Sequence, residues 1–233
     1  MTLEALNEEI IACQKCARLV AWREELAREK RKAYRDWEYW GKPVPGFGDR
    51  RARVLVVGLA PGAHGSNRTG RQFTGDASGG FLYPALHRAG FANQPKAVAR
   101  DDGLALTGVY ITAAARCAPP DNKPSPDELH NCQPYLEREL ELIKPKVIVC
   151  LGRVAFDRIL RIFSIPAASM KFAHGALFQL RPAASDGRPW LLNGDHWLLC
   201  SYHPSQQNTA TGKLTRQMFD GIWATARELI END

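Results

Sequence analysis

Short apolar runs alternate along this chain with longer amphipathic segments. Five runs have the length and composition of strands, and they are residues 53–60, 109–112, 146–151, 176–180 and 197–202. Apolar residues recur at helical spacing between them, in segments 81–89, 126–143, 154–163 and 214–229. Ser125 can cap a helix that has Pro126 in its first turn, so the second of these helices has a clear start. The pattern predicts strands and helices in alternation.

Such alternation is typical of a mainly parallel sheet that is covered by helices on both faces. We therefore predict an α/β fold, a three-layer α/β/α sandwich, made by a single domain over residues 1–233. Residues 1–48 form a helical N-terminal arm in this prediction. Its helix starts with Leu3 and Leu6 and should continue through a basic stretch until Pro43 breaks it.

Composition and charge narrow the class of protein only slightly. The chain is 45% hydrophobic and has a formal net charge of +6, which permits an anionic partner without requiring one. No secretory signal and no run long enough to span a membrane is present, so we expect a cytosolic protein. Residues 18–35 contain seven basic residues, and aromatic residues follow. This pattern favours a solvated helix face over a DNA-facing edge.

Four of the six cysteines suggest a shared site. Two others fall inside predicted strands, where a buried thiol is usually inert. Cys13 and Cys16 form a CxxC in the arm, whereas Cys117 and Cys132 lie in and beyond a proline-rich loop in the middle of the chain. In a cytosolic protein such a set indicates metal or redox use rather than disulfides. The spacing alone leaves zinc, a four-iron cluster and chance clustering open.

Two loops that follow predicted strands carry polar residues suited to chemistry. Residues 58–70 read Gly-Leu-Ala-Pro-Gly-Ala-His-Gly-Ser-Asn-Arg-Thr-Gly, and Phe-Thr-Gly-Asp follows at 73–76. Residues 203–208 read His-Pro-Ser-Gln-Gln-Asn. Ligands of open α/β sheets bind at the carboxyl ends of strands, so we expect a ligand there. The glycine-rich loop matches neither the Walker P-loop nor the dinucleotide fingerprint, which argues against a nucleotide cofactor.

Together the two loops resemble the uracil-DNA glycosylase superfamily, which has an active-site loop after the first strand and a His-Pro-Ser motif after the last. The form of the first loop and the cysteine spacing are similar to the fifth family, the broad-specificity iron–sulfur enzymes of bacteria and archaea. The resemblance covers nearly the whole chain. It implies a [4Fe–4S] cluster on Cys13, Cys16, Cys117 and Cys132, and a glycosylase that removes uracil and other deaminated bases from DNA in base-excision repair.

Four residues have candidate roles in breaking the N-glycosidic bond, each beside a structural alternative. His203 can stabilise the negative charge that grows on the departing base, or be a structural histidine. Phe73 can stack on a flipped base, or plug the core. Asn122 can bind the base or the water, or form an Asx turn. Asp76 can organise the water or offset the cationic charge of the sugar, or cap a helix.

Further substrate contacts are expected from the same two loops, at Gly58, Ala60, Gly62, His64, Asn67, Arg68, Ser205, Gln206 and Asn208. Leu59 and Ala60 stand where better-known families of the superfamily have an acid, which is a departure from the pattern. Residues 111–114 read Ile-Thr-Ala-Ala and lack the asparagine with which the related thermophilic iron–sulfur family reads uracil. Both departures favour a pocket that tolerates other deaminated bases.

Two other functions explain parts of the sequence. A zinc- or cluster-stapled nucleic-acid-binding protein without catalysis accounts for the basic stretch and the cysteines, but leaves His203 unexplained. A small-molecule nucleosidase accounts for the glycine-rich loop. The glycosylase reading accounts for both loops, and no lysine is placed convincingly as a Schiff-base nucleophile. We therefore expect a monofunctional enzyme, a monomer, whose partner is uracil-containing DNA.

Overall fold

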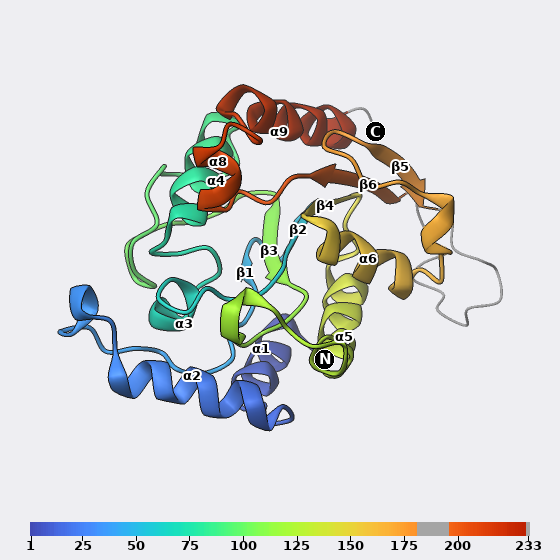
Figure 1. Ribbon diagram of the computed structural model, residues 1–233. Coiled ribbons are helices and arrows are strands. Elements are labelled where there is room, and N and C mark those ends of the chain that lie inside the picture. The colour runs from blue at the N-terminus through green and yellow to red at the C-terminus, as the bar shows by residue number, and fades with distance from the viewer. Residues whose placement is uncertain (181–195, 232–233) are drawn as a thin grey trace.

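The computed structural model describes residues 1–180 and 196–231. Within these residues the chain forms a six-stranded sheet of order β1-β3-β2-β4-β6-β5 (Figure 1). The inner strands are parallel to one another, and the edge strands β1 and β5 are antiparallel to their neighbours. The strands are β1 (Phe47–Gly48), β2 (Val54–Gly58), β3 (Val109–Ala113), β4 (Val147–Leu151), β5 (Leu177–Leu180) and β6 (His196–Ser201). The mainly parallel sheet is confirmed, and the two-residue strand β1 is an addition.

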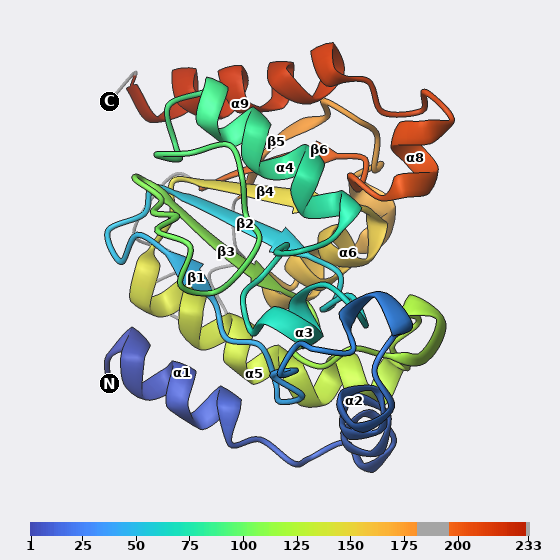
Figure 2. The same ribbon diagram turned by 90° about the vertical axis from the view of Figure 1, so that its left-hand side faces the viewer.

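Helices cover both faces of the sheet (Figure 2). Val54 and Val56 of β2 pack in one core with α4 and α9, and Leu55 and Val57 pack in another with α5 and α6. The four helices are α4 (Ala77–Arg88), α9 (Arg216–Glu231), α5 (Pro126–Ile143) and α6 (Arg153–Ile162). Strands buried on both faces carry apolar residues at every position, which is why they appear as uninterrupted runs in the sequence. The three-layer architecture is therefore confirmed.

The N-terminal arm is not the single helix that its sequence predicts. It contains α1 (Leu3–Ile11) and α2 (Ala17–Glu29), and the CxxC lies in the connection. Leu6 and Ile10 of α1 pack on α5, whereas α2 contacts α3 (Ser66–Thr69). Figure 2 shows α1 lying along α5, with α2 in a different direction. Because the two helices pack on different neighbours, the chain must turn between them, and the prediction of a continuous helix is wrong.

Other boundaries shift where a cap decides them. Helix α4 begins earlier than expected because Asp76 caps it, accepting a hydrogen bond from the Gly79 amide at 3.0 Å. Ser125 caps α5 as expected, with Glu128 closing a capping box. The short elements are η1 (Lys32–Tyr34), η2 (Pro120–Asn122), η3 (Ala167–Ser169) and α8 (Gln206–Ala210). None of the helices in the described ranges is long and apolar enough to cross a membrane.

Candidate active site

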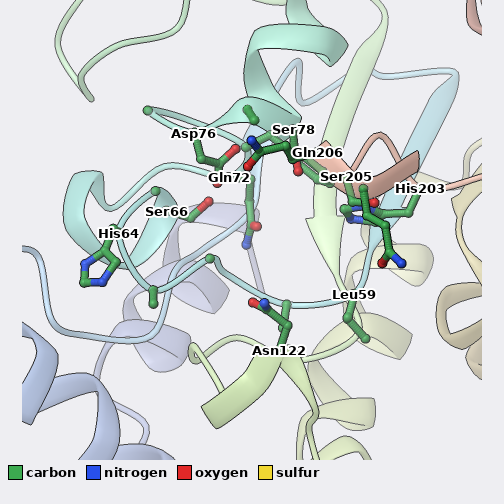
Figure 3. Close-up of a pocket in the computed structure, with 18 of the residues that line it drawn as sticks. Leu59, His64, Ser66, Gln72, Asp76, Ser78, Asn122, His203, Ser205 and Gln206 are labelled. Carbon is green, nitrogen blue, oxygen red and sulfur yellow. The ribbon is translucent and has the colours of Figure 1, made fainter. Parts of the chain in front are cut away.

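Loops at the carboxyl ends of β2, β3 and β6 meet around a cavity of about 750 Å³ (Figure 3). This is the edge of the sheet at which α/β proteins bind their ligands. The cavity brings together most of the residues proposed from the sequence, namely Ala60, Gly62, His64, Phe73, Asp76, Asn122, His203, Ser205 and Gln206. Residues from three separate segments therefore share one site, as the topology predicts.

Asp76 is both a helix cap and a cavity residue. Its Oδ1 accepts the hydrogen bond from Gly79, and its Oδ2 lies so close to Gly65 that a Cβ there would stand 2.0 Å away. A Cβ on Gly62 would likewise stand 2.9 Å from the Asp76 Oδ2 atom. Burial raises the pKa of Asp76, while the Gly79 and Ser78 amides and the Arg68 guanidinium lower it. The helix-cap alternative and the placement in the cavity are thus compatible.

His203 follows β6 and contributes its ring to the cavity wall (Figure 3). Asn208, which was expected to contact substrate, does not line the cavity and instead holds the backbone in place, since its Nδ2 donates to the His203 carbonyl at 2.9 Å. Burial lowers the pKa of His203 to about 4. The imidazole is therefore neutral near pH 7, and one of its ring nitrogens carries a proton that can be donated to a ligand.

Phe73 packs between the core and the cavity. It has a left-handed backbone conformation, with φ of 52°, and its ring is 5.8 Å from that of His203. The ring tip also lies against Gly58, where a Cβ would be 2.7 Å from the Phe73 Cζ atom. Gly58 is thus required by the packing of Phe73 and does not itself line the cavity. Phe73 belongs to the apolar core and also lines the cavity, so both of its readings agree with its position.

Asn122 lies on the opposite side of the cavity from Asp76 (Figure 3). It ends η2 in a left-handed conformation, with φ of 56°, and its backbone amide donates to Pro119 at 3.2 Å. Its side-chain amide has no hydrogen bond to any residue that the structure describes, so the Asx turn is not formed by these residues. The side chain is exposed and lines the cavity, where it can meet a ligand.

Two further residues that were expected to contact substrate face the protein instead. Asn67 is fully buried, and its Nδ2 donates to the Arg23 carbonyl at 3.4 Å. Arg68 is 3% exposed, with Nε donating to the His64 carbonyl at 2.7 Å and Nη2 to the Gly75 carbonyl at 2.9 Å. Neither side chain lines the cavity. The structure thus corrects the expected role of both residues from substrate contact to support of the loop.

The arm supplies cavity residues that the sequence did not single out. Arg31 and Tyr34 both line the cavity, together with Gln72 from the β2–α4 connection and Ser78 from the first turn of α4. The basic and aromatic composition of residues 18–40 was the feature of the sequence that could have indicated this placement of Arg31 and Tyr34. A solvated helix face is the wrong interpretation for the part of this stretch that reaches the cavity.

The four proposed ligand cysteines gather at the junction of the arm with the loop after β3. The pKa of Cys117 is raised to about 12, mainly by burial; the Arg23 guanidinium acts to lower it, and the neighbouring Cys132 and Cys13 thiols act to raise it. The pKa of Cys132 is raised mainly by burial, and the Cys16 and Cys13 thiols also act to raise it. Nevertheless, no three His, Cys, Asp or Glu side chains in residues 1–180 and 196–231 stand in an arrangement that would hold a metal ion.

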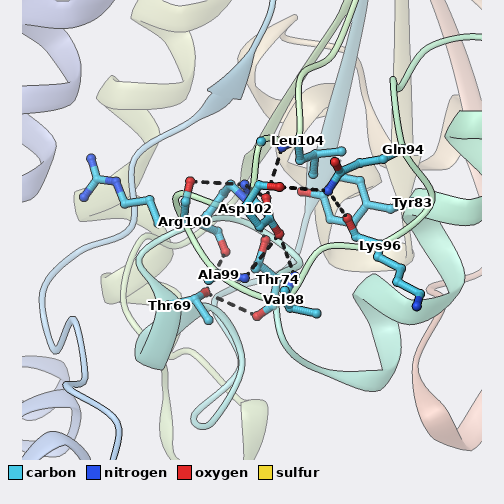
Figure 4. A network of polar contacts seen from close by, with 12 residues as sticks. Thr69, Thr74, Tyr83, Gln94, Lys96, Val98, Ala99, Arg100, Asp102 and Leu104 are labelled. Atoms are coloured by element: carbon cyan, nitrogen blue, oxygen red, sulfur yellow. Dashed lines mark hydrogen bonds and ion pairs between the residues drawn. The ribbon is translucent and has the colours of Figure 1, made fainter.

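A buried ion pair fixes the loop of residues 98–104 (Figure 4). Arg71 donates to both carboxylate oxygens of Asp102, at 2.8 and 2.7 Å, and the side chains are 2% and 8% exposed. Asp102 also accepts hydrogen bonds from three backbone amides in residues 98–104. Burial raises the pKa of Asp102, but Arg71 and these amides outweigh it and hold the pKa well below its usual range. The pair joins this loop to the segment that contains Phe73.

Asp102→Asn should therefore destabilise the fold strongly. The change leaves the buried Arg71 charge without its counter-ion, a loss of about 3–5 kcal/mol in the free energy of unfolding. The lowered pKa means that the stabilisation is present at neutral pH and is lost as the pH falls through the folded-state value. Chemical denaturation at neutral pH measures the effect.

The matched control is Asp220→Asn, which removes a carboxylate from the half-exposed pair with Arg88. Exposed pairs contribute about 0–1 kcal/mol. Equal losses in the two variants would contradict the role given to Asp102.

Comparison with known proteins places this arrangement in a family. Residues 45–227 match the family model described as "Uracil DNA glycosylase superfamily". The chain is 51% identical over 230 residues to the "Type-5 uracil-DNA glycosylase" of Thermus thermophilus, covering 98% of this chain and 99% of that protein. It is 47% identical to the protein of the same name from Mycobacterium leprae, with 98% and 96% covered. Its identity to a "Type-4 uracil-DNA glycosylase" of Archaeoglobus fulgidus is lower, 32%, with 77% and 74% covered. The chain therefore belongs to the uracil-DNA glycosylase superfamily, and within it to the fifth family.

Proposed function

We propose that this chain is a uracil-DNA glycosylase that hydrolyses the N-glycosidic bond of uracil in DNA and so starts base-excision repair. The observation that carries the proposal is the meeting of Asp76 and His203 in one cavity at the carboxyl edge of the sheet. Relatives of 45–51% identity that are named type-5 uracil-DNA glycosylases support it. Among the described residues no lysine lines the cavity, so a Schiff base has no evident nucleophile and the enzyme is monofunctional.

The chemistry needs stabilisation at both ends of the breaking bond. The nucleotide must first leave the base stack and enter the cavity. His203, as a neutral imidazole, donates a hydrogen bond to the base oxygen on which negative charge grows. The Asp76 carboxylate offsets the positive charge of the sugar and orients the attacking water. Asn122, on the other side of the cavity, contacts the base or the water through its amide.

The scope of bases extends beyond uracil in this proposal. The cavity of about 750 Å³ is larger than a pyrimidine ring requires, and its wall includes the apolar side chains of Leu59 and Ala60. At Leu59 and Ala60 the wall presents no polar group that a base other than uracil would leave unpaired, and an unpaired buried polar group is the strongest source of discrimination in a binding site. We therefore expect other deaminated bases, including purines, to be accepted.

The cysteine cluster completes the proposal. The donor set fits an iron–sulfur cluster because it consists of four thiols, two of them buried, beside the cationic Arg23, whose Nη1 donates to the Cys117 Sγ at 3.0 Å. Asn131 also donates to the Cys16 Sγ, at 3.5 Å. Cys13, Cys16, Cys117 and Cys132 would hold a [4Fe–4S] cluster. When bound, it would supply a covalent link between the arm and the loop after β3.

Cleavage of a single-uracil oligonucleotide tests the function. The protein is incubated with a labelled duplex that contains one uracil, and the product is treated with alkali to break the abasic site. Strand breakage at the uracil, only after alkali, is the expected result for a monofunctional enzyme. An intact strand together with hydrolysis of free nucleosides would make the protein a nucleosidase, and binding without either activity would make it a nucleic-acid-binding protein.

Gln206 and Gln207 should matter more for duplex than for single-stranded DNA. Both are exposed residues of α8 at the cavity rim, where they can fill the gap left by an extruded nucleotide, and only a duplex has such a gap. The double alanine variant should therefore bind uracil-containing duplex about tenfold more weakly, with single-strand affinity changed much less. Gln217→Ala, an exposed glutamine of α9, is the control. Equal weakening on both substrates would argue against a wedge.

A further inference from the structure

Arg68 lies between two aromatic rings of the arm. Its guanidinium carbon is 4.0 Å from the centroid of the Tyr34 ring and 4.0 Å from that of the Trp37 ring. We call these three residues the Arg68 stack. Figures 1 and 2 show that α2, which precedes the two aromatic residues, passes beside α3, the single turn that carries Arg68. A guanidinium with a ring on each face is held in both position and orientation.

The same guanidinium binds the loop that ends in Asp76. Its hydrogen bonds to the carbonyls of His64 and Gly75 span the turn between them, and Gly75 directly precedes Asp76. The approach is close, since a Cβ on Gly75 would be 2.4 Å from the Arg68 Nη2 atom. Its third nitrogen, Nη1, has no hydrogen-bond partner among the described residues. Arg68 therefore brings an incompletely paired positive charge behind the loop of the catalytic carboxylate.

The arm reinforces this loop through the backbone and through a histidine. The Trp40 amide donates to the Arg68 carbonyl at 2.9 Å, and the Gly41 amide donates to the Asn67 carbonyl at 3.0 Å. The Tyr39 hydroxyl is 3.1 Å from Nδ1 of His64. By contrast, Trp37 is 37% exposed, so its ring is placed to contact Arg68 rather than to fill the core.

We propose that Arg68 is a positioning residue for Asp76 and that the arm, through Tyr34 and Trp37, holds Arg68 in the orientation this requires. The proposal rests on the proposed function, since it concerns the carboxylate of that reaction. A direct phosphate contact by Arg68 is not the role that its burial supports, because the guanidinium is covered by the two rings. The arm is thus part of the catalytic apparatus although it supplies no reacting group.

The charge of Arg68 gives the proposal a signature in the pH dependence. Among the described residues, the charge of Arg68 from α3 lowers the pKa of Asp76, and the charge of Asp76 raises the pKa of Tyr83 from α4. His203 faces the same cavity and is neutral above a pH of about 4. Removing the guanidinium should raise the pKa of Asp76, so the acid limb of the cleavage rate should move to higher pH. A merely structural role for Arg68 would not shift this limb.

The test compares Arg68→Ala, Arg68→Lys and Trp37→Ala in single-turnover cleavage of a uracil duplex across pH. Arg68→Ala should slow cleavage by about tenfold or more at neutral pH, with DNA affinity within about twofold of wild type. Its acid limb should move to higher pH. Arg68→Lys keeps the positive charge, so its acid limb should lie at the wild-type pH. Its rate should be only partly restored, because an ammonium lacks the planar set of N–H donors of a guanidinium. Trp37→Ala should show a smaller loss, and Trp37→Phe should retain the rate.

Arg227→Ala is the matched control. Arg227 also lies over an aromatic ring, Phe91 at 4.0 Å, and donates to a backbone carbonyl, that of Ala89, but it does so on α9 away from the cavity. Its loss should leave the rate and the acid limb unchanged. If Arg68→Ala weakens DNA binding more than tenfold at an unchanged rate, or leaves the limb where it was, the positioning role is overturned.

Trypsin provides a readout that does not depend on activity. The arm carries cleavage sites at Arg28, Lys30, Arg31, Lys32 and Arg35. Arg68→Ala and Trp37→Ala should make these sites more rapidly cut, and Arg227→Ala should not. If the wild type fails to cleave uracil, the proposed function fails, yet the proteolysis still shows whether the stack holds the arm. Unchanged cutting in both variants would show that the Arg68 stack does not hold the arm. Trp37→Ala removes an exposed ring, so it gives this answer even if Arg68→Ala does not fold.

Discussion

Asp76→Asn is expected to slow single-turnover cleavage of a uracil-containing duplex by about a hundredfold or more, while the affinity for that DNA changes little. The asparagine keeps the shape of the side chain and an oxygen that can cap α4 by accepting from Gly79. Only the negative charge is lost. Because that charge opposes a cation that exists in the transition state and not in the bound substrate, its removal should act on the rate rather than on binding.

The pH profile separates Asp76 from His203. Burial raises the pKa of Asp76, so its carboxylate is protonated at a higher pH than that of an exposed aspartate. His203 stays neutral until the pH approaches about 4. The acid limb that belongs to Asp76 should therefore disappear in Asp76→Asn, and His203→Ala should lose a comparable factor in rate while keeping that limb. Asp127→Asn, an exposed carboxylate in the first turn of α5, controls for charge. A wild-type rate in the Asn variant would leave Asp76 as a helix cap and make Asn122 the next candidate for holding the water.

The sheet and the strand-end loops could be predicted because their signals are local. A parallel strand buried on both faces is a continuous apolar run, and residues 54–58 have that form. Asp76 and His203 lie in loops after such strands, so their meeting follows from the rule that parallel strands end at one edge. The Asp76 cap was also readable, since aspartate is a preferred N-cap residue.

The arm and α3 could not be read in the same way. Lys30 ends α2 with φ of 51°, a conformation that few residues other than glycine adopt and that the sequence does not mark. The turn there is what brings Arg31 and Tyr34 to the cavity. Helix α3 has four residues, all buried, which is too short for a periodic pattern. Asn67 and Arg68 therefore gave no sign that they face the protein.

The cysteine site is the other place where a single change should have a large effect. In Cys117→Ser we expect the iron content per chain and the visible absorbance of an iron–sulfur centre to fall together, with much lower thermal stability. Cys117 is buried beside Arg23 and close to Cys132 and Cys13. Its replacement would therefore disturb the hydrogen bond of the buried Arg23 to Sγ, in addition to freeing the arm from the loop after β3.

Cys150→Ala is the matched control for this experiment. Cys150 is fully buried in β4, opposite Cys200 in the register with β6, so its removal costs packing but should leave the iron content unchanged. The raised pKa of Cys117 adds a dependence on pH, since the thiol must lose its proton to bind metal and binding should therefore weaken as the pH falls. Wild-type protein prepared without oxygen that is colourless and holds one zinc ion per chain would replace the cluster with a zinc site. In that case Cys117→Ser should still release the metal and loosen the arm, because the same four thiols would hold it.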